Sequence, residues 1–319
     1  MNETDWPAVA VVGAGAVGCY YGGMLARAGC PVTLIGRPAH TEAIERDGLT
    51  LDTLSFKERV AVRASTEIGA ARGADLVLFC VKSTDTGETA QQLAPMLAPD
   101  AIVLSMQNGV DNLERLRLHI KGPAFAAVVY VAAAMAGPGH VRHTGRGDLV
   151  IGALERDAVA RQKAAPLLAR LSGWFERAAV GCPVSDNVEG ELWAKLLINC
   201  AYNAISALGR ARYRRIGAHP LALGVMKAAV AEVIAVAGAA GVRLPEGDLV
   251  ESAVAISRSL AGATSSTAQD LARGKRTEID YLNGFVVRRG DELGVPVPVN
   301  RTLHALVKLL EEAEADEAR

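Results

Sequence analysis

Three polar side chains recur at four-residue spacing, one that could donate a proton, Lys195, and two that could bind a hydroxyl group, Asn199 and Asn203. In an α-helix each step of four residues turns by about 40°, so the three would form one polar stripe beside an apolar surface. A lysine ammonium group can stabilise an oxygen that gains negative charge and can donate a proton to it. Asparagine amides suit a hydroxyl group, because a site built for a hydroxyl leaves buried partners unpaired when the ligand lacks it.

The same stripe could instead be the water-facing side of an amphipathic helix, since Glu191 and Ser206 fall on the same arc. A solvent face normally favours Glu, Lys and Arg, whereas asparagine is a poor helix former that competes for backbone hydrogen bonds. The two asparagines favour a binding role, while the spacing alone is compatible with both interpretations.

A glycine-rich turn near the N-terminus has the spacing of a dinucleotide-binding motif. Residues 13–18 read GAGAVG, follow the apolar run AVAVV and open a helical segment that ends near Gly29. In this motif Gly13 makes the tight turn, Gly15 lets the backbone approach a pyrophosphate, and Gly18 permits close helix–strand packing. The helix N-terminus adds amide donors and a positive dipole end. The alternative is a merely flexible turn in a chain that contains 32 glycines.

Arg37 stands where an enzyme specific for NAD(H) would carry an acid. About nineteen residues after Gly18 the sequence reads Ile35-Gly36-Arg37, without a carboxylate to bind a ribose 2′-hydroxyl. The planar, permanently charged guanidinium of arginine suits a 2′-phosphate, so the sequence favours NADP(H) as the cofactor. The alternative is a solvated arginine that simply follows a strand.

Two further apolar runs end in polar residues. Lys82 follows LVLFCV, and Gln107-Asn108-Gly109 follows AIVLSM. In an open parallel sheet the carboxyl ends of the strands line the cofactor crevice. Lys82 could equally be a solvated lysine, and Asn108-Gly109 a simple turn.

Hydroxyl and carboxylate residues gather again towards the C-terminus. Thr264-Ser265-Ser266 precedes Gln269-Asp270, and residues 277–280 read TEID, which resembles a capping box at the start of a helix. The alternative interpretations are loop serines and a carboxylate that satisfies the dipole of the helix.

The first half of the chain predicts an α/β fold with an N-terminal Rossmann-type, doubly wound parallel sheet. Short runs rich in Val, Ile and Leu alternate there with helix-length stretches. Between residues 141 and 152 a glycine-punctuated pair of short strands is expected to add a hairpin at one edge, followed by a helix over about 157–177. The predicted parallel strands are 8–12, 32–35, 76–81, 101–106 and 125–131.

The second half predicts an all-helical C-terminal domain, because strand patterns stop after Cys182-Pro183. We expect residues 1–184 to form the NADP-binding sheet domain and residues 185–319 the helical, substrate-binding domain. A site is expected at the carboxyl ends of the strands and between the domains. The predicted helices are 189–208, 220–240, 248–260, 277–293 and 301–314.

Composition narrows the function classes. The chain has 319 residues, more than the ~250 at which a single core stops growing, and 50% of them are hydrophobic, which excludes disorder as its main state. Lys and Arg number 34 against 35 Asp and Glu, so no global basic field favours nucleic acid or an anionic membrane. The N-terminus lacks a signal-peptide pattern, and the apolar segment 222–240 carries Lys227 and Glu232. A soluble, cytoplasmic protein is expected.

The five cysteines predict neither a disulfide framework nor a metal site, because they are odd in number, scattered and without a CxxC pair. Cys19, Cys80 and Cys200 fall in apolar segments, where a buried small hydrophobe is favoured over a nucleophile.

Several of these segments occur together, and in the same order, in one family of enzymes. They are the glycine motif, the strand end at Lys82, Gln107-Asn108-Gly109, HTGRGDLVIG, LWAKLLINCAYNAISAL and SSTAQDLARGKRTEIDYLNGF. From Val9 to about Lys308 the chain resembles the ketopantoate reductase family, the 2-dehydropantoate 2-reductases. The resemblance implies NADPH-dependent reduction of the ketone of 2-dehydropantoate to (R)-pantoate, a step toward pantothenate and coenzyme A.

The resemblance also implies roles for single residues. Lys195 looks like the family's general acid, Glu278 like its substrate-binding carboxylate, and Asn108 would lie between nicotinamide and substrate. Asn199 and Asn203 would hold the substrate hydroxyl, and Ser266 would contact the substrate carboxylate. The residues implied to hold NADPH are Gly13, Gly15, Ala16, Val17, Gly18, Arg37 and Lys82.

The reaction class is better defined by these motifs than the substrate is, because family members with the same motifs can act on other 2-keto acids. One alternative is therefore another hydroxyacid dehydrogenase of the same two-domain build. The other is a non-catalytic NADP(H)-binding sensor, which would not need the general acid Lys195. The apolar segment 220–260 could pack within the chain or against a second copy, so a homodimer stays open.

Overall fold

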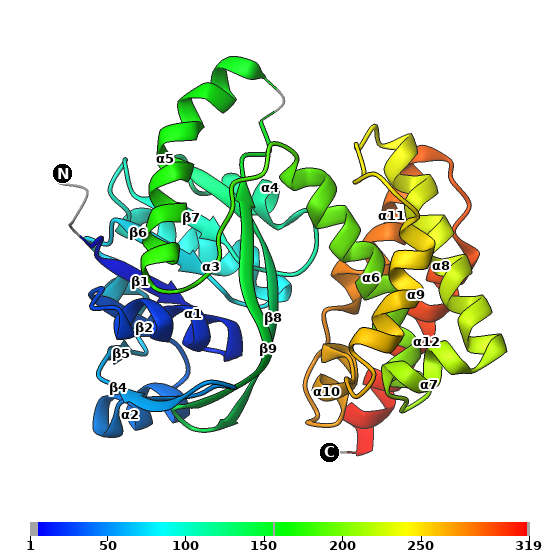
Figure 1. Ribbon diagram of the computed structural model, residues 1–319, viewed down its shortest axis with the longest axis horizontal. Coiled ribbons are helices and arrows are strands. Elements are labelled where there is room, and N and C mark those ends of the chain that lie inside the picture. Colours follow the sequence, from blue (N-terminus) through cyan, green and yellow to red (C-terminus); the bar gives the residue numbers. More distant parts are fainter. Residues whose placement is uncertain (1–5, 156, 318–319) are drawn as a thin grey trace. The chain divides into compact units, whose positions relative to one another are not determined.

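The computed structural model describes residues 6–155 and 157–317, and the side chains of 6–155 and 157–313. The chain divides into two compact units, Met1–Val188 and Glu189–Arg319 (Figure 1). The division between the units lies after Val188, whereas the boundary predicted from the sequence lies after residue 184. All named strands of the described chain belong to the first unit, and the second unit is helical.

The first unit is built on one nine-stranded sheet with the order β4-β3-β9-β8-β7-β6-β1-β2-β5. The strands from β5 to β8 in this order run parallel, and β1 pairs with β2 on one side and β6 on the other. The strand order reverses at β1, so the expected doubly wound sheet is confirmed. The parallel strands are β1 (Val9–Val12), β2 (Val32–Ile35), β5 (Arg63–Ser65), β6 (Leu76–Phe79), β7 (Ile102–Ser105) and β8 (Ala124–Gly137).

The remaining strands extend the sheet beyond β8. The long strand β9 (His140–Gly152) is antiparallel to β8, while β3 (Leu49–Asp52) runs parallel to β9 and antiparallel to β4 (Lys57–Val60). Strands β3, β4 and β5 were not predicted from the sequence. The edge strand β4 reads KERV with three exposed residues, a polar composition that protects a sheet edge and hides its strand pattern.

The prediction of two short strands between residues 141 and 152 was wrong, because this segment is the single strand β9. Its hairpin partner is β8, and the turn lies just before His140. The glycines on either side of Arg146 mark an irregular stretch of the ladder, where the register shifts opposite Ala132 and Arg146 has a φ of 47°.

Helices cover the buried sheet. Alternate strand residues such as Val9 and Val11 share one core with helices α1 (Ala16–Arg27) and α5 (Ala158–Arg177). All four residues of β1, of β6 and of β7 are buried, as is typical of parallel strands. The unit also contains α2 (Pro38–Asp47), α3 (Thr86–Leu93), α4 (Asn112–Arg117) and the short 3-10 helices η1 (Ile68–Ala71), η2 (Ser83–Asp85) and η3 (Ala94–Met96).

The second unit is helical, as expected. The predicted helix over 277–293 is broken, because η4 (Ile279–Tyr281) ends before α11 (Asn283–Leu293), and Leu282 has a φ of −112° and a ψ of −101°. The short helices α7 and α10 were not predicted. The other elements are α6 (Val188–Leu208), α7 (Tyr213–Ala218), α8 (Pro220–Ala239), α9 (Leu249–Ser259), α10 (Ser266–Leu271) and α12 (Pro298–Glu317).

Within the described residues, α8 is the one helix whose length and composition would allow it to cross a membrane. The helix packs against α7, α9, α11 and α12. Its Glu232 accepts hydrogen bonds from the backbone N–H groups of Val299 and Asn300 at 2.8 and 2.9 Å, at the start of α12. A carboxylate that caps a neighbouring helix is typical of a helix in a protein bundle.

Glycines permit a close contact between the ends of β1 and β6. Gly13 has a φ of 107°, and a Cβ atom there would be 2.6 Å from the carbonyl carbon of Cys80 and the nitrogen of Val81. A Cβ atom on Gly18 would overlap the carbonyl oxygen of Gly13. Gly15 differs from both, because its φ of −89° suits any residue and its Cβ would meet no atom within 4 Å.

We expect Gly18→Ala to lower the free energy of unfolding by about 3 kcal/mol, because the clash involves backbone that cannot move aside. Gly15→Ala should change it by no more than about 0.5 kcal/mol. Urea unfolding followed by circular dichroism measures both. Equal destabilisation by the two variants would contradict this account of the turn.

Candidate active site

The carboxyl ends of four neighbouring strands carry the first group of candidate residues. Strands β2, β1, β6 and β7 are adjacent and parallel, so their ends lie at one edge of the sheet. The glycine turn follows β1, Arg37 follows β2, Lys82 follows β6 and Asn108 follows β7. The residues that the sequence analysis assigned to the cofactor therefore lie at one edge of the first unit.

The glycine turn offers the features that a phosphate group needs. The backbone N–H groups of Gly13 and Ala14 both donate to the carbonyl oxygen of Ile35 at 2.9 Å, which fixes the turn against the end of β2. The first-turn amides of α1, on Ala16, Val17 and Gly18, have no acceptor within the helix. The open space beside Gly15, next to these donors, fits the pyrophosphate of a dinucleotide.

Arg37 is exposed and occupies the N-cap position of α2. Its carbonyl oxygen accepts a hydrogen bond from the Thr41 hydroxyl at 3.3 Å. Within the described residues, no hydrogen bond or ion pair engages the guanidinium group. Gly36 packs against the glycine turn, since a Cβ there would be 2.6 Å from the Cβ of Ala14. Among the described residues, the positively charged guanidinium group of Arg37 therefore has no bonding partner that a ligand would have to displace.

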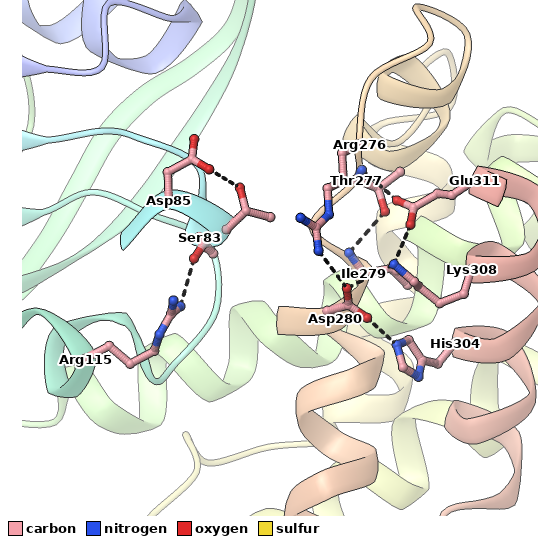
Figure 2. A network of polar contacts seen from close by, with 11 residues as sticks. Ser83, Asp85, Arg115, Arg276, Thr277, Ile279, Asp280, His304, Lys308 and Glu311 are labelled. Carbon is pink, nitrogen blue, oxygen red and sulfur yellow. Dashed lines mark hydrogen bonds and ion pairs between the residues drawn. The ribbon is translucent and has the colours of Figure 1, made fainter. Parts of the chain in front are cut away.

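Asn108 is held by hydrogen bonds to its backbone. Its carbonyl oxygen accepts from the Ser83 hydroxyl at 2.9 Å and from Nδ2 of Asn112 at 2.6 Å. Nδ2 of Asn112 also donates to the Ser83 hydroxyl at 3.1 Å. Nη1 of Arg115 donates to the Ser83 carbonyl at 2.8 Å (Figure 2). Ser83 and Asn112 are buried, so these bonds are protected from water.

Gln107 extends the same network to the end of β6. Its Nε2 donates to the Val81 carbonyl at 3.0 Å and to the Thr86 hydroxyl at 2.7 Å. The Thr86 hydroxyl in turn donates to Oδ1 of Asn112 at 3.0 Å. The bonds fix the segments that carry Lys82 and Asn108 relative to each other.

The second group of candidates lies on α6. Lys195 and Asn199 are half-buried and Asn203 is buried, so the interpretation as a fully water-facing stripe was wrong. Nδ2 of Asn199 is buried and has no hydrogen-bond partner among the described residues. A buried amide donor without a partner costs free energy, and in proteins a water, an ion or a ligand commonly supplies the acceptor for such an atom.

Two contacts bring Ser266 and Glu278 to the same part of α6. The Ser265 hydroxyl donates to the carbonyl oxygen of Asn203 at 3.1 Å and accepts from the backbone N–H of Ala268, so it caps α10, which begins at Ser266. Ile279 is fully buried and shares a small apolar core with Ala204 of α6. The structure thus places the neighbours of Ser266 and Glu278 beside residues 203–204.

Residues 277–280 do not form the expected capping box. The Thr277 hydroxyl accepts from the backbone N–H of Ile279 at 3.2 Å, and the Asp280 carboxylate contacts α12 instead of a helix N-terminus. Glu278 is half-buried at the start of η4.

The sequence analysis missed the polar residues that hold these segments in place, above all Ser83, Thr86 and Asn112, and on α12 His304, Lys308 and Glu311. The only signal was their position, because Ser83 and Thr86 follow Lys82 and Asn112 lies one helical turn after Asn108. Many of their partners are distant along the chain and are brought close only by the fold, as with Ser83 and Asn108 at a separation of 25 residues and Thr277 and Glu311 at 34.

The cysteines show no sign of catalytic chemistry. Burial raises the pKa values of the Cys19, Cys30 and Cys182 thiols to about 12, and it also raises those of Cys80 and Cys200. A thiol with a raised pKa is a poor nucleophile at neutral pH.

A cavity of about 650 Å³ lies away from the candidate residues. Its lining includes Val9, Val32, Arg63 and Glu45, at the amino ends of the parallel strands β1, β2 and β5. This edge of the sheet is opposite to the glycine turn, and we assign the cavity no part in the site.

The comparisons with known proteins agree with this arrangement. The chain matches the family model described as ketopantoate reductase PanE/ApbA over residues 9–156 and the model for its C terminal part over residues 187–311. The 2-dehydropantoate 2-reductase of Halobacterium salinarum is 35% identical, over 94% of this chain and 98% of the relative. A solved PanE/ApbA family ketopantoate reductase from Ralstonia eutropha is 54% identical, with a TM-score of 0.89, over 96% of this chain and 99% of that one.

Two more distant solved structures, each 23% identical over 96% of this chain and 99% of the other, share the fold. One is a D-mandelate dehydrogenase with NADH and anilino(oxo)acetate, at a TM-score of 0.86, and the other is a dimeric ketopantoate reductase from Staphylococcus aureus, at 0.78. With the sequence motifs, the two family models and a relative above 30% identity all in agreement, this chain belongs to the ketopantoate reductase PanE/ApbA family and is an NAD(P)-binding oxidoreductase.

Proposed function

We propose that the chain catalyses the NADPH-dependent reduction of 2-dehydropantoate to (R)-pantoate, in the biosynthesis of pantothenate and coenzyme A. The observation that carries this proposal is the α6 stripe, in which Lys195 is followed by Asn199, whose buried Nδ2 has no partner among the described residues. The named family and its 2-dehydropantoate 2-reductase relatives support the choice of substrate.

In the proposed mechanism Lys195 is the general acid. When bound, NADPH supplies the hydride that adds to C2 of the keto acid. The electron pair of the C=O π bond then moves onto the carbonyl oxygen, which takes a proton from Nζ of Lys195 and becomes the product hydroxyl. An ammonium donor stabilises the growing negative charge before it gives up the proton, and each effect lowers the barrier by a few kcal/mol.

The other residues of the second unit are proposed to bind the substrate. The amide groups of Asn199 and Asn203 hold its hydroxyl, Ser266 contacts its carboxylate, and Glu278 supplies a substrate-binding carboxylate. The hydrogen bond between Ser265 and Asn203 and the small apolar core that contains both Ile279 and Ala204 support a shared role for these segments.

The first unit is proposed to hold NADP(H), with Asn108 between nicotinamide and substrate and with Gly13, Gly15, Ala16, Val17, Gly18, Arg37 and Lys82 around the cofactor. We propose that the NADP-binding domain, predicted as residues 1–184, corresponds to the first unit, and that the substrate-binding domain, predicted as residues 185–319, corresponds to the second. The uncommitted guanidinium of Arg37 supports a preference for the 2′-phosphate of NADP(H).

A second candidate is the reduction of another 2-oxo acid by the same residues. The observation in its favour is the D-mandelate dehydrogenase of similar fold, whose structure contains NADH and anilino(oxo)acetate. The non-catalytic sensor is disfavoured, because a sensor would need neither Lys195 nor an amide donor poised for a substrate.

We also propose that the chain forms a homodimer and acts in the cytoplasm. Only a third of the apolar helix α8 is buried, and Leu221 and Leu309 are 78% and 62% exposed. A second copy of the chain would cover such apolar residues, and the relative from Staphylococcus aureus is described as dimeric. Five free cysteines suit a reducing compartment.

The function is tested by the loss of NADPH absorbance with 2-dehydropantoate and a panel of other 2-oxo acids. Wild-type protein should turn over 2-dehydropantoate fastest, and Lys195→Ala should lower kcat by about 10²–10⁴-fold, because the proton donor is lost. Lys163→Ala, at an exposed position, is the matched control. Faster turnover of a different 2-oxo acid would favour the second candidate, and NADPH binding without any turnover would favour the sensor.

The cofactor preference is tested with Arg37→Ala. This variant should lower kcat/KM for NADPH by about tenfold or more, because a charge-assisted contact to the 2′-phosphate is lost, and should leave kcat/KM for NADH nearly unchanged. Arg46→Ala, which removes an exposed arginine of the same helix, is the control. A wild-type preference for NADH, or an equal loss with both cofactors, would contradict the proposed role.

The dimer is tested by sedimentation velocity at micromolar protein concentration. The wild type should sediment as a dimer, and Leu221→Glu or Leu309→Glu should shift it towards the monomer, because a charge would be buried in the contact. Leu118→Glu, at a 71% exposed leucine of the first unit, should leave the dimer intact. A monomeric wild type would refute the proposal.

A further inference from the structure

The segment of residues 276–282, which carries Glu278 and is called here the Glu278 segment, has little regular structure of its own. Its only helical part is η4, a 3-10 helix of three residues, and the backbone breaks at Leu282 before α11 begins. A single 3-10 turn has weak hydrogen bonds and does not hold its shape alone. The position of Glu278 must therefore come from contacts with other elements.

Three polar contacts join this segment to one face of α12 (Figure 2), and along the chain they lie on both sides of Glu278. Before Glu278, the backbone N–H of Thr277 donates to Oε1 of Glu311 at 2.7 Å. After it, Oδ1 of Asp280 pairs with Nε2 of His304 at 2.7 Å, and Oδ2 accepts from Nζ of Lys308 at 3.1 Å. His304, Lys308 and Glu311 are spaced by four and three residues, which puts them on one face of the helix.

Lys308 links the two anchoring carboxylates. Its Nζ also donates to Oε2 of Glu311 at 2.7 Å, and the side chains of Lys308 and Glu311 are only 30% and 10% exposed. Burial raises the pKa of Asp280, but the hydrogen bonds from His304 and Lys308 outweigh it, so the pKa is lowered overall. Burial lowers the pKa of Lys308, and its bonds to Glu311 and Asp280 outweigh that effect. Asp280 and Lys308 are therefore both charged at neutral pH, and because they are partly buried, salt screens their attraction less than that of a fully exposed pair.

Gly284 explains how His304 reaches Asp280. A Cβ atom on Gly284 would be 2.8 Å from Nε2 of His304, so the imidazole packs directly against bare backbone of α11. The segment is also held by Ile279, which is buried in one small apolar core with Ala204 of α6 and Leu303 and Val307 of α12. Apolar packing keeps Ile279 buried but is not directional, so it does not determine how the backbone is oriented. Hydrogen bonds are directional, so those of Thr277 and Asp280 determine the orientation of the segment on either side of Glu278.

We propose that Asp280 and Glu311 are positioning residues, which hold Glu278 in the orientation that binds the substrate by fixing its segment to α12 through His304 and Lys308. This inference rests on the proposed role of Glu278 as a substrate-binding carboxylate. Asp280 and Glu311 act through the backbone of the segment and need no contact with the substrate themselves.

The test compares Asp280→Asn and Glu311→Gln with Glu278→Gln and with Asp291→Asn as the matched control. Asp291 forms an exposed ion pair with Arg301 that also joins α11 to α12, so its variant removes a carboxylate of the same unit that is not bonded to His304, Lys308 or Glu311. Rates are measured well below the unfolding temperature of every variant. Asp280→Asn and Glu311→Gln should raise KM for 2-dehydropantoate about tenfold, with kcat changed far less and KM for NADPH unchanged.

The double variant Glu278→Gln/Asp280→Asn shows whether Asp280 acts through Glu278. Its KM should equal that of Glu278→Gln alone, because Asp280 has nothing left to position. Independent effects that multiply would overturn the proposal, and so would a lowered melting temperature with an unchanged KM in Asp280→Asn. If Glu278→Gln itself leaves KM unchanged, or the wild type reduces no 2-oxo acid, the proposed function is what fails, and the positioning role falls with it.

Hydrogen exchange of the protein without substrate tests the anchoring separately. Peptides that span residues 276–282 should exchange faster in Asp280→Asn and Glu311→Gln than in the wild type, because the Thr277 amide loses its protection. Asp291→Asn should leave these peptides unchanged. Equal exchange in all four proteins would refute the anchoring whatever the kinetics show.

Discussion

The backbone at Gly13 lies against the peptide that joins Cys80 to Val81, so closely that any side chain at position 13 would force the ends of β1 and β6 apart. The order of the sheet reverses at these strands, and the other strand ends of the candidate site are arranged around them. The Ile35 carbonyl ties the same turn to β2, and Gln107 ties the end of β6 to that of β7. The positions of the strand ends at this edge of the sheet therefore depend on one close backbone contact.

Much of the fold was accessible from the sequence, because buried parallel strands are short continuous apolar runs and β1, β2, β6 and β7 are of this kind. Strands at the edge escaped detection for the opposite reason. In β4 charged residues face water and only Val60 is buried, so no apolar pattern remains. The long strand β9 was split in two because its glycines, which accommodate an irregular ladder, have the same signature as a turn.

The candidate site divides in the same way. Spacing identified the α6 stripe because one helix carries all three residues, and strand ends identified Lys82 and Asn108 because the topology of parallel sheets is regular. Spacing predicted a capping box at residues 277–280, and this was wrong, since the Asp280 carboxylate contacts His304 and Lys308 of α12 and does not cap a helix N-terminus. Partners that are distant in sequence are set by packing, which local patterns do not encode.

The buried thiols should react only slowly with electrophiles. With a pKa near 12, a thiol such as that of Cys19 is ionised in only about one molecule in 10⁵ at pH 7, and only the thiolate reacts. Oxidants and alkylating reagents should therefore modify the folded chain slowly at every native cysteine. A cysteine introduced at an exposed position would react much faster than the native cysteines. A single fluorophore or spin label could therefore be attached to it without first removing the native thiols.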